Sequence, residues 1–166
     1  SSDVCSSDLK FQRNAIKRGL EKLSLQPDDI IIISDVDEIP DINTINNLKN
    51  INFRGVYALE QDLYYYNINN KCVLKWTHPK VCSYDEYLKI GVPDDVRFIG
   101  CNTLNNGGWH LSYFGDINFI VNKLKNFAHT EFNTEESTNP ENILEKISTN
   151  KDLFGRDGFM DFNYIN

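Results

Sequence analysis

Four consecutive isoleucines, residues 30–33, constrain the fold of this chain more than any other stretch. Asp28 and Asp29 precede the run, and Ser34 follows it. A short β-branched run between turn-forming residues is typical of a strand that is buried on both faces. Upstream, apolar residues recur with helical spacing between Phe11 and Leu23. A helix followed by a buried strand is half of a βαβ unit and favours an α/β fold.

The rest of the chain carries further strand and helix patterns. We expect strands over residues 56–59, 63–68, 71–76, 96–100 and 109–114, and helices over residues 42–48, 84–90, 117–127 and 140–147. Asn69 and Asn70 suit a hairpin turn, because Asn tolerates positive φ. Asp116 and Asn139 are placed to cap the last two helices, and residues 152–166 read as a loop.

The first nine residues differ in composition from the rest. Four of the ten serines lie within residues 1–7 and SSD occurs twice, whereas Asn, Ile and Lys dominate after Lys10. We interpret residues 1–9 as a foreign tail, such as a cloning or sequence-assembly scar, with a genuine polar arm as the alternative. Residues 10–166 are predicted to form a single domain, since domains commonly run ~100–200 residues.

Composition excludes several classes of protein. The net charge of −7 argues against a nucleic-acid partner, because phosphate backbones attract basic surfaces. No stretch approaches the ~20 consecutive apolar residues of a transmembrane segment. Cys5, Cys72, Cys82 and Cys101 fit no metal-binding spacing. Reduced thiols in a cytoplasmic protein are therefore expected, with peripheral membrane attachment left open.

Asp35 and Asp37 form the sharpest chemical feature of the sequence. They lie two positions apart just after the isoleucine run, so they can point to one side of an extended chain. Ligands of open α/β sheets bind at the carboxyl ends of strands. Paired carboxylates suit Mn²⁺ or Mg²⁺, which can in turn bind a diphosphate. The alternative is that both residues form a turn or cap the next helix.

Two other segments are candidates for binding and catalysis. Glu60 and Asp62 precede three tyrosines, and aromatic faces beside carboxylates suit a sugar site, although a strand packing its tyrosines into the core is equally consistent. Gly107 and Gly108 allow a close approach of the backbone before Trp109 and His110. His110 is a candidate metal ligand or proton carrier, and a structural histidine is the alternative.

The C-terminal segment carries two further candidates. Arg156 and Asp157 lie between two glycines, so that Arg156 could bind a phosphate and Asp157 could accept a proton from a hydroxyl. A plain turn explains the same residues. His129 follows a predicted helix, where a capping role is a sufficient explanation.

Together these segments resemble glycosyltransferase family 17. That family includes the bisecting β-1,4-mannosyl-glycoprotein N-acetylglucosaminyltransferase and many bacterial relatives. The resemblance rests on residues 11–14, 28–29, 35–40 (Asp-Val-Asp-Glu-Ile-Pro), 107–112 (Gly-Gly-Trp-His-Leu-Ser) and 127–131. It implies a GT-A-like (Rossmann-like) mixed sheet flanked by helices, incomplete at its N-terminus because family members begin further upstream.

The resemblance also implies an activity and a site. We expect metal-assisted, inverting transfer of N-acetylglucosamine from a nucleotide-sugar donor, UDP-GlcNAc, to a glycan acceptor. Asp35 and Asp37 match the family's Asp-x-Asp motif for metal and diphosphate. The expected metal ligands are Asp35, Asp37 and His110, and the expected donor-binding residues are Asp35, Asp37, Trp109, His110 and Arg156. The candidate general bases are Asp62, Glu60 and Asp157, with Glu38 a weaker fourth.

Two other functions remain open at this point. A strand followed by Asp-x-Asp also begins the site of haloacid-dehalogenase-type phosphatases, although Ile39 stands where that site needs Thr or Ser. A non-catalytic carbohydrate-binding fragment is the third possibility. Binding of UDP in the presence of Mn²⁺ would separate the transferase from both.

Overall fold

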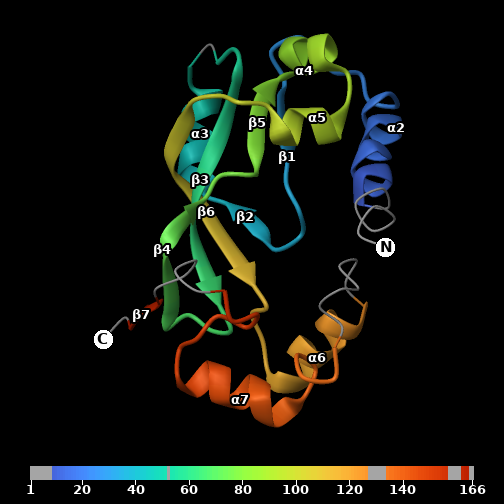
Figure 1. Cartoon of the computed structure of the whole chain (residues 1–166). Helices are drawn as coiled ribbons and strands as arrows, with labels where there is room; N and C mark the ends of the chain where they lie inside the picture. Colours follow the sequence, from blue (N-terminus) through green and yellow to red (C-terminus); the bar gives the residue numbers. More distant parts are fainter. Residues whose placement is uncertain (1–8, 52, 127–133, 157–161, 165–166) are drawn as a thin grey trace. The chain divides into compact units, whose positions relative to one another are not determined.

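The computed structural model describes residues 9–51, 53–126, 134–156 and 162–164, and it is a mixed α/β fold. The chain forms two compact units. The first unit comprises Lys10–Asp62 and Lys75–His110, and the second comprises Leu63–Leu74 and the described residues from Leu111 onward. Three long strands, β3 (Val56–Tyr65), β4 (Asn70–Trp76) and β6 (Thr103–Ser112), contribute residues to both units (Figure 1).

The first unit is built on five strands in the order β1-β5-β3-β6-β2. β1 (Ile30–Ile33) pairs antiparallel with β5 (Lys80–Ser83), which pairs antiparallel with β3. β2 (Glu38–Pro40) pairs antiparallel with β6. A βαβ unit would place a parallel strand beside β1. The strand that pairs with β1 is antiparallel, so the expected βαβ unit is not found there.

The isoleucines of β1 are covered on both faces, as the sequence predicts. Ile31 and Ile33 are buried against Cys82, Tyr87 and Val96. Ile30 and Ile32 pack on the opposite side against a second cluster, formed by Ile45, Leu48, Phe53, Leu59 and Val81. β1 thus joins the two apolar clusters of the first unit, which explains the uninterrupted β-branched run.

Helices α2 (Ile16–Leu20), α3 (Ile42–Lys49), α4 (Tyr84–Ile90) and α5 (Pro93–Phe98) complete the first unit (Figure 1). The Asp41 carboxylate accepts the Asn43 and Thr44 N–H groups and caps α3. The strand expected over residues 96–100 is wrong. Pro93 opens α5 and two aspartates occupy its first turn, which favours a helix over the β-branched character of Val96.

The second unit combines the far ends of β3 and β4 with a helical pair, α6 (Ile117–Asn126) and α7 (Pro140–Ser148), which pack on each other (Figure 1). Asp116 and Asn139 accept N–H groups of the first helical turns, so both predicted caps are confirmed. The two strands expected over residues 56–68 are one strand, β3. The expected C-terminal loop includes β7 (Phe162–Tyr164), which pairs with β4. In the described part of the chain, no helix is long and apolar enough to cross a membrane.

Gly108→Ala is expected to destabilise the protein by about 1–3 kcal/mol, the usual cost of a strained backbone position. Gly108 has φ of +129°, and a Cβ there would collide with the carbonyl oxygen of Ile39 on β2. Gly19→Ala is the matched control. It lies in α2 with open space around it, so alanine is expected to stabilise by about 0.5–1 kcal/mol. Urea denaturation of both variants tests the pair, and equal stabilities would contradict the close β2–β6 approach.

Candidate functional site

A tight turn after β1 shapes the acidic segment. The Glu38 N–H donates to the Asp35 carbonyl at 3.1 Å, and the Asp35 N–H donates to the Glu38 carboxylate at 2.7 Å. This turn leads directly into β2, whose register with β6 places Glu38 opposite His110. The acidic segment is therefore fixed at one end by its own turn and at the other by strand pairing.

Glu38 and Arg97 form a buried ion pair below this turn. Both terminal nitrogens of Arg97 donate hydrogen bonds to the Glu38 carboxylate, Nη1 to Oε2 at 2.7 Å and Nη2 to Oε1 at 2.5 Å. Each of the two residues is 3% exposed. The indole N–H of Trp76 donates to Glu38 Oε1 at 2.6 Å. Glu38 is the least favoured of the four candidate general bases. Its carboxylate accepts hydrogen bonds from Asp35, Trp76 and Arg97, and it holds the Arg97 and Trp76 side chains in place.

Asp35 is held by two arginines. Arg13 donates to both carboxylate oxygens, at 3.1 and 2.8 Å, and Arg97 Nη2 lies 3.0 Å from Asp35 Oδ2. Burial alone would raise the pKa of Asp35, but the hydrogen bonds from Arg13 and the charges of Arg97 and Arg13 lower it below its usual value. Asp35 is therefore an ionised group whose charge is balanced by guanidinium groups.

Asp37, two residues after Asp35, lies beside His110. Asp37 Oδ2 is 3.9 Å from His110 Nε2, and the Asp37 side chain is 25% exposed. The Trp76 ring packs edge-on against His110, with centroids 4.4 Å apart, and it packs against His78 in a tilted arrangement, with centroids 4.5 Å apart. Burial, followed by the charges of Arg97 and Lys80, lowers the pKa of His78, so this imidazole is neutral at pH 7. An aspartate, two imidazoles and an indole therefore gather at one place.

Strand alternation separates the predicted site residues into two groups. Consecutive residues of a strand point to opposite faces. On β4, Lys75 forms an ion pair with Asp62, while the next residue, Trp76, contacts Glu38 and His110. On β6, Trp109 and His110 are likewise consecutive. We refer to the side of Glu38, Trp76 and His110 as the His110 face, and to the side of Glu60, Asp62, Lys75 and Trp109 as the Trp109 face.

The Trp109 face has a small acidic cavity of about 90 Å³. Its lining comprises Asp41, Glu60, Asp62, Lys75, Asn106, Gly108 and Trp109. This volume equals about three water molecules at ~30 Å³ each, so the cavity can receive only the edge of a sugar. The 41% exposure of Trp109 leaves ring surface for stacking beside these carboxylates. The predicted tyrosines do not contribute to this cavity: Tyr64, Tyr65 and Tyr66 are buried, at 9%, 4% and 2% exposure, as in the alternative in which the strand packs them into the core.

The remaining predicted residues lie elsewhere. Arg156 belongs to the second unit, where it binds Asp152 and Tyr65. Asp157, His129 and Cys5 lie outside the described residues. Cys72, Cys82 and Cys101 form no disulfide in the described part of the chain, and burial raises the pKa of Cys72 and of Cys82 to about 12. These two thiols are therefore protonated and unreactive at neutral pH.

The sequence predicts a divalent metal at Asp35, Asp37 and His110, and the described residues around them can be compared with that prediction. No cluster of three or more His, Cys, Asp or Glu side chains suited to a metal occurs among them. Both oxygens of Asp35 already accept bonds from Arg13, which opposes metal ligation there. Asp37 and His110 face each other across 3.9 Å and supply one oxygen and one nitrogen donor. The metal assignment to Asp35, Asp37 and His110 stays a prediction, and the geometry favours the last two.

Sequence reasoning missed the two arginines that organise this site. Arg97 was placed in a strand, and its position in α5 became apparent only with the helix start at Pro93. Arg13 lies in the N-terminal helical segment, 22 residues before Asp35. An ion pair between residues so far apart in the chain leaves no local pattern in the sequence. The available signal for Arg13 was its place in residues 11–14, one of the segments on which the resemblance rests.

The described residues form a mixed α/β fold, in which Asp37 faces His110 and Asp35 is held by Arg13 and Arg97. Comparison with protein families matches residues 5–158 to glycosyltransferase family 17, and the chain belongs to that family. The match begins within the segment 1–9 that composition sets apart. No curated protein and no solved structure matches the chain. Family membership indicates glycosyl transfer, with a sugar donor and an acceptor as substrates.

Proposed function

We propose that this protein transfers N-acetylglucosamine from UDP-GlcNAc to a hydroxyl of a glycan, with inversion at the sugar carbon. The observation that carries the proposal is the Asp37–His110 pair on the His110 face, in a chain of a glycosyltransferase family. The pair is accessible through Asp37, whose side chain is 25% exposed, and Asp37 projects from the turn that Arg13 and Arg97 hold at Asp35. A nucleotide diphosphate is the donor group that this combination suits best.

The donor diphosphate would be held at this pair. Asp37 and His110 would bind a divalent cation, Mn²⁺ or Mg²⁺, which when bound neutralises the charge that develops on the leaving diphosphate. Trp76 fixes the plane of the His110 ring by edge contact. Arg13 and Arg97 hold Asp35 ionised, and this anchors the turn from which Asp37 projects. The protein thus orients the donor through groups that are already fixed in place.

The acceptor hydroxyl must lose its proton as it attacks the sugar. Glu60 and Asp62 lie on the Trp109 face, and Asp62 is also bound by Lys75, so neither faces a donor at Asp37. His78 packs on the same indole as His110 and is neutral at pH 7 because its pKa is lowered. We therefore assign the role of general base to His78, whose free imidazole nitrogen accepts the proton.

The experiment that tests this function is calorimetric titration with UDP, with and without Mn²⁺, followed by an assay of UDP-GlcNAc turnover on glycan acceptors. Mn²⁺-dependent UDP binding and sugar transfer are expected. Hydrolysis of p-nitrophenyl phosphate without UDP binding would establish the phosphatase instead. Glycan binding without UDP binding would leave only a carbohydrate-binding fragment.

His78→Gln is expected to lower kcat about 10²–10⁴-fold, the usual contribution of a general base. Glu60→Gln is expected to leave kcat within a few-fold, because Glu60 lies on the other face. In the unmodified protein, activity should fall as the pH drops through the His78 pKa, which burial lowers below the usual value of histidine, because protonation removes the base. The pH–rate profile checks both points. A greater loss of kcat in Glu60→Gln than in His78→Gln would show that the general base lies on the Trp109 face.

A further inference from the structure

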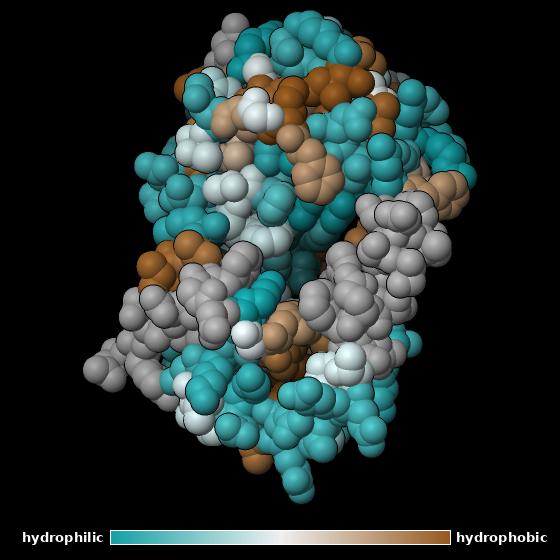
Figure 2. Space-filling model, viewed as in Figure 1, coloured by the Kyte–Doolittle hydropathy of each residue, from teal (hydrophilic) through white to brown (hydrophobic). Residues whose placement is uncertain are grey.

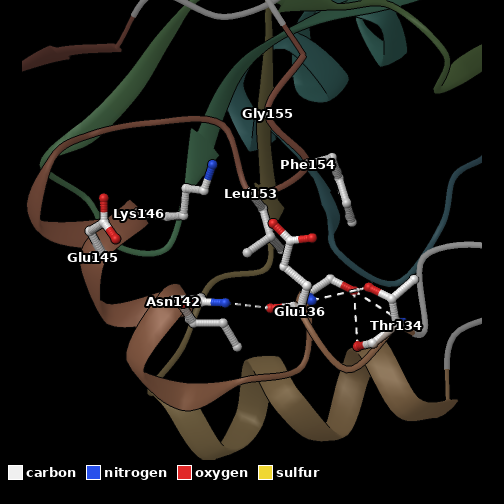
Figure 3. A pocket seen from close by; sticks show the side chains of 10 residues that line it. Thr134, Glu136, Asn142, Glu145, Lys146, Leu153, Phe154 and Gly155 are labelled. Atoms are coloured by element: carbon white, nitrogen blue, oxygen red, sulfur yellow. Dashed lines mark hydrogen bonds between the residues drawn. The ribbon is translucent and has the colours of Figure 1, made fainter.

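The second unit contains a cavity of about 400 Å³ beside α7 (Figure 3). It is lined from the turn at residues 134–137, from α7 and from residues 153–155. Its volume is within the ~300–1,000 Å³ that small-molecule sites occupy. We propose that this cavity binds a neutral saccharide, one or two rings of the acceptor glycan. The identification of this ligand as acceptor rests on the function proposed above.

The floor of the cavity is apolar. Ile143 and Leu153 are buried, at 1% and 5% exposure, and the half-buried ring of Phe154 lines the same space. Figure 2 shows apolar surface in a hollow in the lower part of the view, with hydrophilic surface below it. Sugar rings have an apolar C–H face that packs on an aromatic ring. The floor therefore suits one face of a saccharide.

The rim of the cavity is polar and carries more negative than positive charge. Glu136 and Glu145 supply carboxylates, Asn142 an amide and Lys146 a single ammonium. In Figure 3 the Glu136 side chain extends toward Leu153 and Phe154, over the apolar floor. Carboxylates accept hydrogen bonds from sugar hydroxyls. Two carboxylates against one ammonium disfavour a phosphate or a nucleotide, so the rim selects a neutral polyol.

The walls of the cavity are fixed before a ligand binds. Arg156 donates to Asp152 at 2.9 and 2.7 Å, and its guanidinium lies over the Phe154 ring at 5.1 Å. The Tyr113 ring contacts the Phe154 ring edge-on at 5.5 Å. Asn142 donates to the Glu136 carbonyl at 3.1 Å and joins the turn to α7. Arg156, predicted to bind the donor, thus acts here as a positioning residue for Phe154.

The test is calorimetric titration of the full chain with N,N′-diacetylchitobiose, mannobiose, UDP and inorganic phosphate. We expect at least one disaccharide to bind with a Kd of about 1 mM or tighter. Glu136→Gln is expected to weaken that binding about tenfold, because a neutral amide is a poorer acceptor for hydroxyl protons than a carboxylate. Glu135→Gln is the matched control, because Glu135 is an exposed neighbour that does not line the cavity. The Kd of this variant for the disaccharide should be unchanged.

A second pair of variants tests the apolar floor. Phe154→Ala is expected to weaken disaccharide binding, whereas Leu144→Ala, an exposed position of α7 outside the lining, is expected to leave it unchanged. The proposal is overturned if neither disaccharide binds, if Glu135→Gln weakens binding as much as Glu136→Gln, or if Glu136→Gln weakens UDP or phosphate binding instead. Disaccharide binding with these variant effects, without sugar transfer, supports this site and refutes only the proposed function.

Discussion

Replacing Glu38 by alanine is expected to lower the free energy of unfolding by about 3–5 kcal/mol, the range measured when one partner of a buried ion pair is removed. The Arg97 guanidinium would remain 3% exposed with its main carboxylate gone. The Trp76 indole N–H would lose its acceptor as well. Chemical denaturation monitored by circular dichroism measures the loss.

Two variants control for this effect. Glu38→Gln keeps the shape of the side chain and an acceptor for Trp76 but removes the charge. Its loss of unfolding free energy should therefore be smaller than that of Glu38→Ala. Glu21→Ala removes a carboxylate from an exposed position and should change stability by less than about 0.5 kcal/mol. A loss in Glu38→Ala no larger than that of Glu21→Ala would show that Arg97 finds another partner and that the network does not hold the turn.

Asp37→Ala is expected to lower the kcat of sugar transfer by at least about 10²-fold. The variant removes the carboxylate that faces His110 and with it the oxygen donor of the proposed cation site. Stability should change by less than about 1 kcal/mol, because the side chain is partly exposed and Asp35 keeps its arginines. Turnover of UDP-GlcNAc with Mn²⁺, together with thermal unfolding, separates these effects.

Asp35→Ala provides the contrast. It leaves Arg13 and Arg97 short of a partner, so it should lower stability as well as activity. Wild-type turnover in Asp37→Ala would refute the assignment of the donor site. Equal losses of stability in the two variants would show that Asp37 is a structural residue like Asp35.

Local patterns predicted the parts of the fold that local forces determine. The isoleucine run predicted a strand covered on both faces, and Asp116 and Asn139 predicted helix caps, because burial and capping depend on neighbouring residues. The helix at α5 was missed because β-branched character was weighted above the start given by Pro93. That helix determines where Arg97 lies.

The composition of the site depended on strand register, which the sequence does not encode locally. The sequence singles out Asp35, Asp37 and His110, whose role as metal ligands stays a prediction, and alternation alone predicts that Trp109 and His110 face opposite sides. The pairing of Glu38 with His110 determines which carboxylates lie on the His110 face and which lie on the Trp109 face. This pairing links segments that are far apart in the chain. The sequence alone offers Glu60 and Asp62 as candidate general bases, because that register is not visible in it.

The position of β1 at the end of the strand order has a consequence for the behaviour of the protein in solution. Within the described residues, one edge of this isoleucine strand has no strand partner, so its backbone amides and carbonyls can pair with a strand from another molecule. Self-association through this edge should increase with protein concentration. Its length of four residues limits the number of ladder bonds that such an adduct can gain.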